Sequence, residues 1–160
     1  MILPFSTKIN GRPNYFIEKI WLGLLFSGKY GNYMYNIYNK CYSDKFGESW
    51  DDKIGLLPKI HTIRLDNYNR WKEGNKMHLV INNRTDNEFH FTPQILCTSV
   101  QKIEITHENY PILKIDGIAI GFSKLQRLSS NEGFESVEDF FNYFKEDFEG
   151  KIIHWTNFKY

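Results

Sequence analysis

The sequence predicts an α+β fold in which short strands, paired in mixed and antiparallel fashion, are flanked by helices. Residues 16–24 and 137–148 place apolar side chains at helical spacing. Short β-branched runs bounded by turn residues recur along the rest of the chain, which is typical of strands. The segment 112–120 indicates a hairpin, because Asp116-Gly117 supplies the two-residue turn that twisted antiparallel strands prefer.

Composition favours one globular domain spanning residues 1–160, a length that can bury a core without disulfides or metals. Hydrophobic residues make up 41% of the chain and aromatic residues 17%. A charged fraction of 24% with a net charge of +1 argues against disorder. This balance also excludes a basic surface over the whole molecule, so any nucleic-acid site is expected to be a local patch.

The two cysteines, Cys41 and Cys97, show neither metal-ligand spacing nor the density of a disulfide framework. A reducing, cytoplasmic location is therefore predicted. No apolar run is long enough to cross a bilayer, and no targeting segment is recognised, so no membrane partner is expected. His78 and His90 fall on neighbouring predicted strands without a third ligand, and we predict no metal and no cofactor.

The first quarter of the chain predicts a strand followed by a helix. Residues 1–5 form the expected strand, and residues 10–13 form a turn in which Pro13 is placed to open the helix. Phe16, Ile17, Ile20 and Leu24 recur on one helical face, and Gly28 is the expected stop.

A tyrosine-rich segment follows, with asparagines and lysines between its rings. The rings offer stacking platforms for bases in one interpretation. In the favoured interpretation they pack against the domain and keep their hydroxyls in water. Residues 43–55 are polar and rich in turn signals, and they are predicted to form a loop. The tyrosines in question are Tyr30, Tyr33, Tyr35, Tyr38 and Tyr42.

The segment from Lys59 to Arg64 crowds a possible base, a possible nucleophile and an anion-binding donor into six residues. Pro58 disfavours a helix here, and residues 61–65 predict a short strand. Strand alternation places Thr62 and Arg64 on one face and His61 and Ile63 on the other. We expect Lys59 in the preceding turn, with its side chain curled over the Thr62 hydroxyl.

The second half of the chain predicts strands and then two helices. Strands are expected at 77–82, at 88–91 with Pro93 interrupting the run, and across 95–106. Ser123 and Gln126 match a capping box for a helix over 124–131 that Gly133 ends. Ser136 is the expected N-cap of the second helix, Gly150 its end, and 152–158 the last strand.

Two motifs resemble those of the ASCH domains, small barrels of the PUA-like superfamily. The first is Lys59-x-x-Thr62-x-Arg64, followed by Trp71-Lys72-x-Gly74 and a strand, with Leu57 where the family usually has glycine. The second is Asn131-Glu132-Gly133-Phe134, which opens toward a helix. The resemblance implies a small mixed and antiparallel PUA-like β-barrel flanked by helices, with residues 27–57 as an insertion.

The resemblance also implies a reaction, because the ASCH members of known activity remove an acyl group from a modified cytidine. It places catalytic roles on Lys59, Thr62 and Glu132. A threonine hydroxyl needs a neighbouring base to become a nucleophile. A lysine serves as that base where burial or a nearby cation such as Arg64 lowers its pKa. An N4-acetylcytidine-type amidohydrolase is the resulting hypothesis.

A different class of function is also compatible with the resemblance, since PUA-like barrels commonly bind RNA or modified bases. Arg64, Arg70 and Lys72 would then hold phosphate while Trp71 stacks on a base. Trp71 is alternatively a packed turn residue. The chain is thus expected to bind a nucleoside, a modified base or RNA, as an amidohydrolase or as a non-catalytic module. A third alternative is an accessory regulator that uses the tyrosine-rich insertion to contact proteins.

Overall fold

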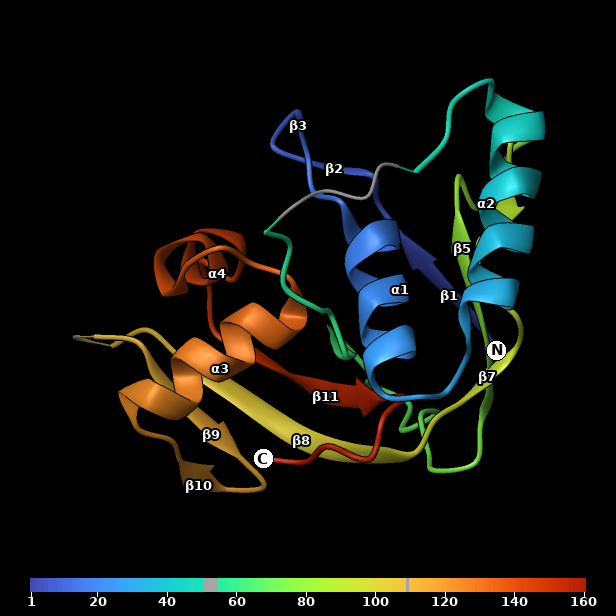
Figure 1. Cartoon of the computed structure of the whole chain (residues 1–160). Coiled ribbons are helices and arrows are strands. Elements are labelled where there is room, and N and C mark those ends of the chain that lie inside the picture. Colours follow the sequence, from blue (N-terminus) through green and yellow to red (C-terminus); the bar gives the residue numbers. More distant parts are fainter. Residues whose placement is uncertain (51–54, 109) are drawn as a thin grey trace. The chain divides into compact units, whose positions relative to one another are not determined.

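The computed structural model describes residues 1–50, 55–108 and 110–160 (Figure 1). The described residues form a mixed α+β fold with four helices and several mostly antiparallel sheets, and they form no closed barrel. The chain divides into two compact units. Unit 1 comprises Met1–Lys59 and Lys76–Leu96, and unit 2 comprises Ile60–Asn75 and Cys97–Tyr160.

Unit 1 is built around strand β5, which pairs in parallel with β1 and antiparallel with β6 and β7. A separate short hairpin, β2 with β3, turns at Asn10 and Gly11, which both have positive φ. The turn and the first strand predicted from sequence are confirmed. The strands are β1 (Ile2–Phe5), β2 (Lys8–Ile9), β3 (Arg12–Pro13), β5 (Lys76–Ile81), β6 (Phe89–His90) and β7 (Ile95–Leu96).

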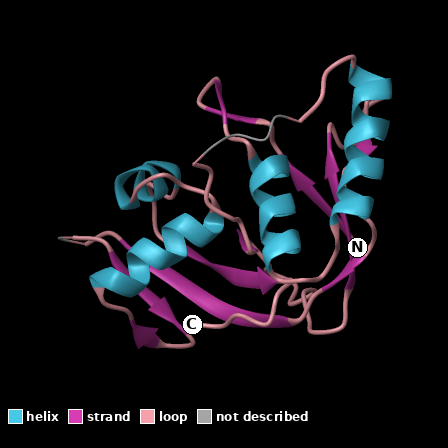
Figure 2. Ribbon diagram, in the orientation of Figure 1, coloured by secondary structure: helices cyan, strands magenta, loops and turns pink. Residues whose placement is uncertain are grey.

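Helices α1 (Phe16–Phe26) and α2 (Asn32–Phe46) complete unit 1 (Figure 2). Helix α1 matches its prediction except at the start, because Pro13 lies in β3 and Tyr15, with φ of 54°, precedes the first turn. Gly28 follows its end in the left-handed conformation, as expected. Helix α2 continues through Phe46, so the loop predicted from residue 43 was wrong over its first residues. Residues 51–54 of that predicted loop lie outside the described residues.

In unit 1 a cluster of aromatic rings surrounds Trp21, which is fully buried. Its ring lies 5.6 Å from that of Tyr35, 5.8 Å from Tyr38 and 6.1 Å from Trp50, measured between centroids. Its indole N–H donates to the Phe91 carbonyl over 2.9 Å. These contacts confirm that tyrosines of the tyrosine-rich segment pack against the rest of their unit.

Unit 2 contains a five-stranded antiparallel sheet in the order β10-β9-β8-β11-β4. The predicted hairpin is confirmed, with Asp116 and Gly117 both at positive φ between β9 and β10. The strands are β4 (His61–Arg64), β8 (Ser99–Thr106), β9 (Ile112–Ile115), β10 (Ile118–Ala119) and β11 (Phe148–His154). Strand β4 stands at the edge of this sheet, with β11 as its neighbour.

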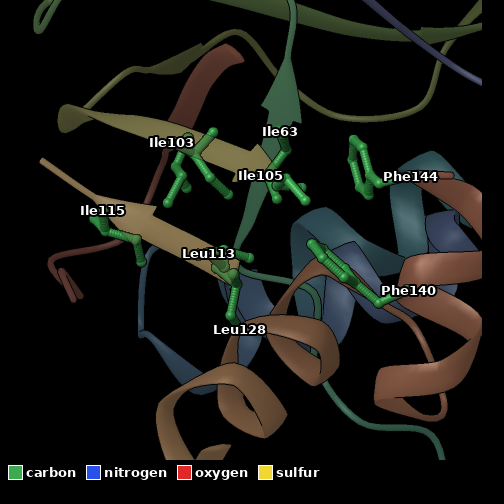
Figure 3. Close-up of a cluster of buried hydrophobic side chains, with 9 residues drawn as sticks. Ile63, Ile103, Ile105, Leu113, Ile115, Leu128, Phe140 and Phe144 are labelled. Carbon is green, nitrogen blue, oxygen red and sulfur yellow. The ribbon is translucent and has the colours of Figure 1, made fainter. Parts of the chain in front are cut away.

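Helices α3 (Phe122–Glu132) and α4 (Val137–Tyr143) cover one face of this sheet (Figure 1). Figure 3 shows Ile63 and Ile105 of the strands on the side of Phe144, and Leu113 next to Leu128 of α3. Alternate strand residues supply this face, as period-two patterning requires. The core consists of Ile63, Ile103, Ile105, Leu113, Ile115, Leu128, Phe140, Phe144 and Ile152.

Three helix boundaries in unit 2 can be compared with the sequence patterns, and two of them agree. Ser136 is the N-cap of α4 as predicted, and its hydroxyl accepts from the Asp139 N–H over 3.0 Å. The capping box expected at Ser123 was wrong, because Gly121 occupies the N-cap of α3 and no side chain caps that helix. Gly133 ends α3 in the left-handed conformation, as expected.

Gly150 does not end a helix, since α4 finishes at Tyr143 and Gly150 lies inside strand β11. A Cβ at this position would stand 2.6 Å from the carbonyl oxygen of Arg64 and 2.6 Å from the ring of Phe148. Glycine is therefore required here by the close approach of β4 to β11. The last strand runs from Phe148 to His154, not from 152 to 158.

The two cysteines lie in contrasting surroundings. Cys41 is exposed on α2, whereas Cys97 is buried in unit 2. No helix among the described residues is long and apolar enough to cross a membrane. Nor do the described residues gather three or more histidine, cysteine, aspartate or glutamate side chains in an arrangement that would hold a metal ion.

Candidate functional site

Glu132, the last residue of α3, organises a buried polar cluster in unit 2. Its side chain is 6% exposed, and it lies at the end of a helix where the macrodipole disfavours negative charge. A carboxylate in such a position needs compensating donors. The cluster around Glu132 supplies them from strand β4.

Three groups of β4 bind the two oxygens of this carboxylate. The Thr62 hydroxyl and the Ile63 N–H each lie 3.1 Å from Oε1, and His61 Nδ1 lies 3.0 Å from Oε2. The Ile63 N–H is available because β4 is an edge strand. A carboxylate placed at the edge, and not over one face, is reached by side chains from both faces. This explains why the adjacent residues His61 and Thr62, which point to opposite faces, bind the same group.

The partners of His61 define a hydrogen-bond chain from Glu132 to Tyr160. An ionised carboxylate accepts only, which assigns the proton of the neutral imidazole to Nδ1 and leaves Nε2 as the acceptor. The Tyr160 hydroxyl then donates to Nε2 over 2.8 Å and accepts from Asn131 Nδ2 over 2.8 Å. Burial raises the pKa of the Tyr160 phenol well above its usual range, so it remains a donor.

His154 stands directly opposite His61 in the β4–β11 register, with ring centroids 5.4 Å apart. It is fully buried, and neither ring nitrogen has a hydrogen-bond partner among the described residues. Burial, followed by the proximity of His61, lowers its pKa to about 3, so the ring is neutral at ordinary pH. Ser99, paired with His154 in the next strand, is also buried and has no partner for its hydroxyl within the described structure.

Lys59, the third residue to which the resemblance gives a catalytic role, belongs to unit 1. It is fully buried, and its backbone N–H donates to the Lys19 carbonyl over 2.8 Å. Its ammonium lies 4.7 Å from the centroid of the Phe16 ring, a cation–π distance. The structure thus brings Thr62 and Glu132 together in unit 2 and describes Lys59 beside Phe16 in unit 1.

The residues expected to bind substrate occupy the end of β4 and the loop after it. Both the Arg70 and Trp71 N–H groups donate to the Asp66 carboxylate over 2.9 Å, which orders this loop. Trp71 is 6% exposed, and this burial favours the packed interpretation of its ring. Arg70 is exposed, with its guanidinium carbon 5.9 Å from the ring centroid of Tyr68.

An open pocket of about 630 Å³ lies beside this loop, within the size range of small-molecule sites. It includes residues from the loop and from the neighbouring strands β8 and β11. Its two lysines are already engaged, because Lys102 contacts Glu104 at 2.8 Å and Glu149 at 3.0 Å, and Lys151 donates to Asn69 over 3.0 Å. The pocket therefore offers a polar surface of mixed charge.

Sequence reasoning missed four members of the cluster: His61, Asn131, His154 and Tyr160. His61 was placed on the strand face opposite Thr62 and given no role, although it adjoins Thr62 in the motif. Asn131 immediately precedes Glu132, so the second motif contained a usable signal. The pairing of His61 with His154 depends on strand register between distant segments, and no local pattern reports it.

The cluster is chemically suited to proton transfer. Glu132 accepts the Thr62 hydroxyl proton in a hydrogen bond, so it is placed to take that proton when the oxygen attacks an electrophile. His61 holds the second carboxylate oxygen and so restricts its orientation. Thr62 is 1% exposed, so a substrate reaches its hydroxyl only when the surroundings of β4 open.

No family model, no curated protein and no solved structure matches this chain in comparisons with known proteins. The ASCH resemblance is therefore carried by its two motifs alone. The geometry of Thr62 and Glu132, one residue from each motif, is the structural observation that bears on it.

Proposed function

We propose that the chain is an ASCH-like protein that binds a nucleoside or modified base and hydrolyses an acylated cytidine-like amide. One observation carries the proposal. Thr62 and Glu132 come from separate motifs 70 residues apart, and they share a hydrogen bond of 3.1 Å. The barrel implied by the resemblance is not needed for this step, because a helix end and an edge strand hold both residues within unit 2.

The proposed reaction is acyl transfer through Thr62. The hydroxyl oxygen attacks the acyl carbon while Glu132 takes the hydroxyl proton. The tetrahedral intermediate collapses with cleavage of the carbon–nitrogen bond, and Glu132 returns the proton to the departing exocyclic amine. Glu132 then takes a proton from water, and the resulting hydroxide attacks the threonine ester. Cleavage of the ester bond releases the carboxylic acid, and Glu132 returns the proton to the Thr62 oxygen, which restores the hydroxyl. His61 positions the carboxylate through its second oxygen.

Incubation of the protein with N4-acetylcytidine, followed by chromatography for cytidine, tests this reaction. Thr62→Val keeps the shape of the side chain and removes its hydroxyl, so turnover is expected to vanish. Thr62→Ser retains the hydroxyl and is the matched variant that keeps measurable activity. Lys59→Ala tests the role that the resemblance gives to lysine. Circular dichroism checks that each variant is folded.

The hydrolytic proposal fails if the wild type is inert toward N4-acetylcytidine and related small amides. It fails equally if Thr62→Val turns over as fast as the wild type. If Lys59→Ala retains activity and Thr62→Val has none, the proposed roles of Thr62 and Glu132 stand. That result would remove the part of the resemblance that rests on the lysine.

A non-catalytic RNA-binding module is the second candidate, and a separate observation favours it. Tyr68 is 82% exposed, and the Arg70 guanidinium lies 5.9 Å from its ring centroid. Lys72 is exposed on the same loop. An open aromatic ring beside cationic side chains is the arrangement that stacks on unpaired bases and attracts phosphate.

Fluorescence anisotropy with a labelled single-stranded RNA measures this binding. Tyr68→Ala is expected to weaken affinity by about 1–3 kcal/mol if a base stacks on the ring. Tyr68→Phe keeps the ring and is the matched control. Affinity should fall as salt concentration rises, because phosphate contacts release counterions. A flat salt response, or equal affinity of the two Tyr68 variants, would exclude this surface as the RNA site.

A further inference from the structure

The turn between β2 and β3 contains Asn10-Gly11, the one Asn-Gly pair in the sequence (Figure 1). Both residues have positive φ, 50° at Asn10 and 77° at Gly11, as a two-residue hairpin turn of the primed type requires. Asparagine is among the thermolabile side chains of proteins. Glycine after it leaves the next backbone nitrogen without a neighbouring side chain. The hairpin lies in unit 1, so its chemistry is independent of the function proposed for unit 2.

The Asn10 side chain is exposed, and it forms no hydrogen bond with another described residue. A Cβ added at Gly11 would meet no atom within 4 Å, so the space beside the Gly11 backbone is open. The side-chain carbonyl carbon of an asparagine approaches the following backbone nitrogen only where both groups are unhindered. Asn10 and Gly11 meet this condition.

The strands on either side of the turn hold it weakly. Among the described strands, β2 and β3 pair only with one another, and each has two residues. An isolated two-stranded hairpin is at best marginally stable in water, so it opens locally at a small cost in free energy. Such opening lets the Asn10 backbone rotate until its side chain reaches the Gly11 nitrogen.

Asn14, in the same segment, lies in the opposite kind of environment. Its residue is 8% exposed, and its amide Nδ2 donates to the Ser6 carbonyl over 2.8 Å. Its Oδ1 accepts from the Phe16 N–H over 3.0 Å. These bonds fix the side chain, and the residue that follows is a tyrosine, whose Cβ hinders the backbone nitrogen. Asn14 is therefore protected, whereas Asn10 is open.

Asp116-Gly117 provides a second comparison, because it occupies the same kind of turn with positive φ at both residues. Its carboxylate is held by the Lys102 N–H, 2.8 Å from Oδ1, and by Gln101 Nε2, 2.9 Å from Oδ2. The β9–β10 hairpin also belongs to a five-stranded sheet. Turn geometry is thus common to the two hairpins, and the freedom of the side chain distinguishes Asn10.

We propose that Asn10 is a site of spontaneous deamidation, which converts it to isoaspartate and aspartate while the protein is folded. The Gly11 backbone nitrogen loses its proton to a base in solution and attacks Cγ of Asn10, which forms a nitrogen–carbon bond. The bond from Cγ to the side-chain nitrogen breaks, and that nitrogen takes up a proton and leaves as ammonia. Water then opens the cyclic imide and returns a proton to the Gly11 nitrogen. Cleavage at Cγ gives aspartate, and cleavage at the backbone carbonyl carbon gives isoaspartate.

The isoaspartate product changes the hairpin in two ways. It lengthens the main chain by one carbon atom, so the two-residue turn that pairs Ile9 with Arg12 is lost. It also adds a carboxylate to a hairpin whose other ionisable residues, Lys8 and Arg12, are basic. The strands contribute Lys8 and Pro13 to the lining of an open pocket of about 500 Å³ in unit 1. That lining changes when the strands separate.

Mass spectrometry after incubation of the whole protein at mildly alkaline pH tests the proposal. Trypsin does not cleave before proline, so Asn10 and Asn14 lie in one peptide, Ile9–Lys19. Fragmentation should place the mass increase of an amide-to-acid change on Asn10 and not on Asn14. Purified isoaspartyl methyltransferase with labelled S-adenosylmethionine should methylate the incubated protein, because isoaspartate exposes an α-carboxylate.

Protein unfolded in urea supplies the reference rate for each side chain. Deamidation of Asn10 in the folded protein should proceed within about tenfold of that reference, because a separate hairpin opens readily. Folding should slow the reaction at Asn14 by more than about tenfold, because its hydrogen bonds must break first.

Gly11→Ala places a methyl group beside the attacking nitrogen and should slow deamidation of Asn10 by at least about tenfold. Gly28→Ala is the matched control, because Gly28 also has positive φ and open space at its Cβ position but does not follow an asparagine. It should leave the rate unchanged, and circular dichroism checks that both variants are folded. An unchanged rate in Gly11→Ala, no mass increase at Asn10, or slowing of Asn10 by more than about tenfold on folding would each overturn the proposal.

Discussion

In unit 1 aromatic rings lie around the buried Trp21, whereas in unit 2 hydrogen-bond partners lie around the buried Glu132. The rings of unit 1 are held by contact area and shape, which tolerate small shifts. The network of unit 2 is stable only if each buried donor and acceptor finds a partner. One chain therefore combines two ways of building an interior, and substitutions should affect them differently.

Removal of the central ring of unit 1 is expected to have the largest effect on stability. Trp21→Ala removes a fully buried ring and its bond to the Phe91 carbonyl, at a cost of about 3–5 kcal/mol. Urea unfolding measures the loss, and hydrogen exchange on peptides of unit 1 locates it. Trp21→Phe keeps most of the ring and should lose much less. A loss below about 1 kcal/mol for Trp21→Ala would contradict the role given to the aromatic cluster.

Replacement of one carboxylate oxygen in unit 2 should have an intermediate effect. Glu132→Gln places an amide NH₂ where a donor from β4 needs an acceptor, so we expect a loss of about 1–3 kcal/mol. Glu135→Gln makes the same change at an exposed position and should stay within about 0.5 kcal/mol. Equal urea midpoints for the two variants would show that the network adds nothing to stability.

The buried His154 should make unit 2 sensitive to acid. The pKa of His154 in the folded chain is about 3, below its ordinary value of 6.5. Between pH 6.5 and 3, the His154 ring is therefore protonated in the unfolded chain and neutral in the folded chain. The free energy of unfolding consequently decreases as the pH falls through this range. The slope should approach 1.4 kcal/mol per pH unit. His154→Phe should flatten this part of the pH profile, and an unchanged slope in that variant would contradict the prediction.

The smallest expected change in stability concerns two tyrosines of α2, one exposed and one packed on other rings. Tyr33 is 77% exposed, so Tyr33→Ala should change stability by no more than about 0.5 kcal/mol. Tyr35 contacts the rings of Trp21 and Trp50, and Tyr35→Ala should cost about 1–3 kcal/mol. Thermal unfolding of both variants measures the two losses of stability. Similar losses would mean that packing on Trp21 does not distinguish the tyrosines.

Local signals account for what the sequence predicted correctly. The Asp116-Gly117 turn, the β-branched strand at 61–64, and the helix after Ser136 each depend on residues close together in the chain. The proximity of Thr62 and Glu132 came from motif resemblance, because no local rule joins residues 70 positions apart.

The errors have equally specific causes. Phe148 continues the spacing of the α4 stripe, so helical periodicity extended that helix, although Phe148 and Gly150 belong to strand β11. His61 and His154 meet through strand register, which depends on tertiary packing. The helical end of α2 was predicted as loop because its residues are polar, yet Phe46 packs on Phe89 at a centroid distance of 5.7 Å.

The exposed thiol of α2 has a practical use. A maleimide dye should react with Cys41 and spare the buried Cys97, which gives one fluorophore at a defined position in unit 1. A second fluorophore at a cysteine introduced by Ile118→Cys, where the native side chain is 72% exposed, would label unit 2. Energy transfer between the two dyes would then measure the separation of the units in solution and report whether a nucleoside changes it.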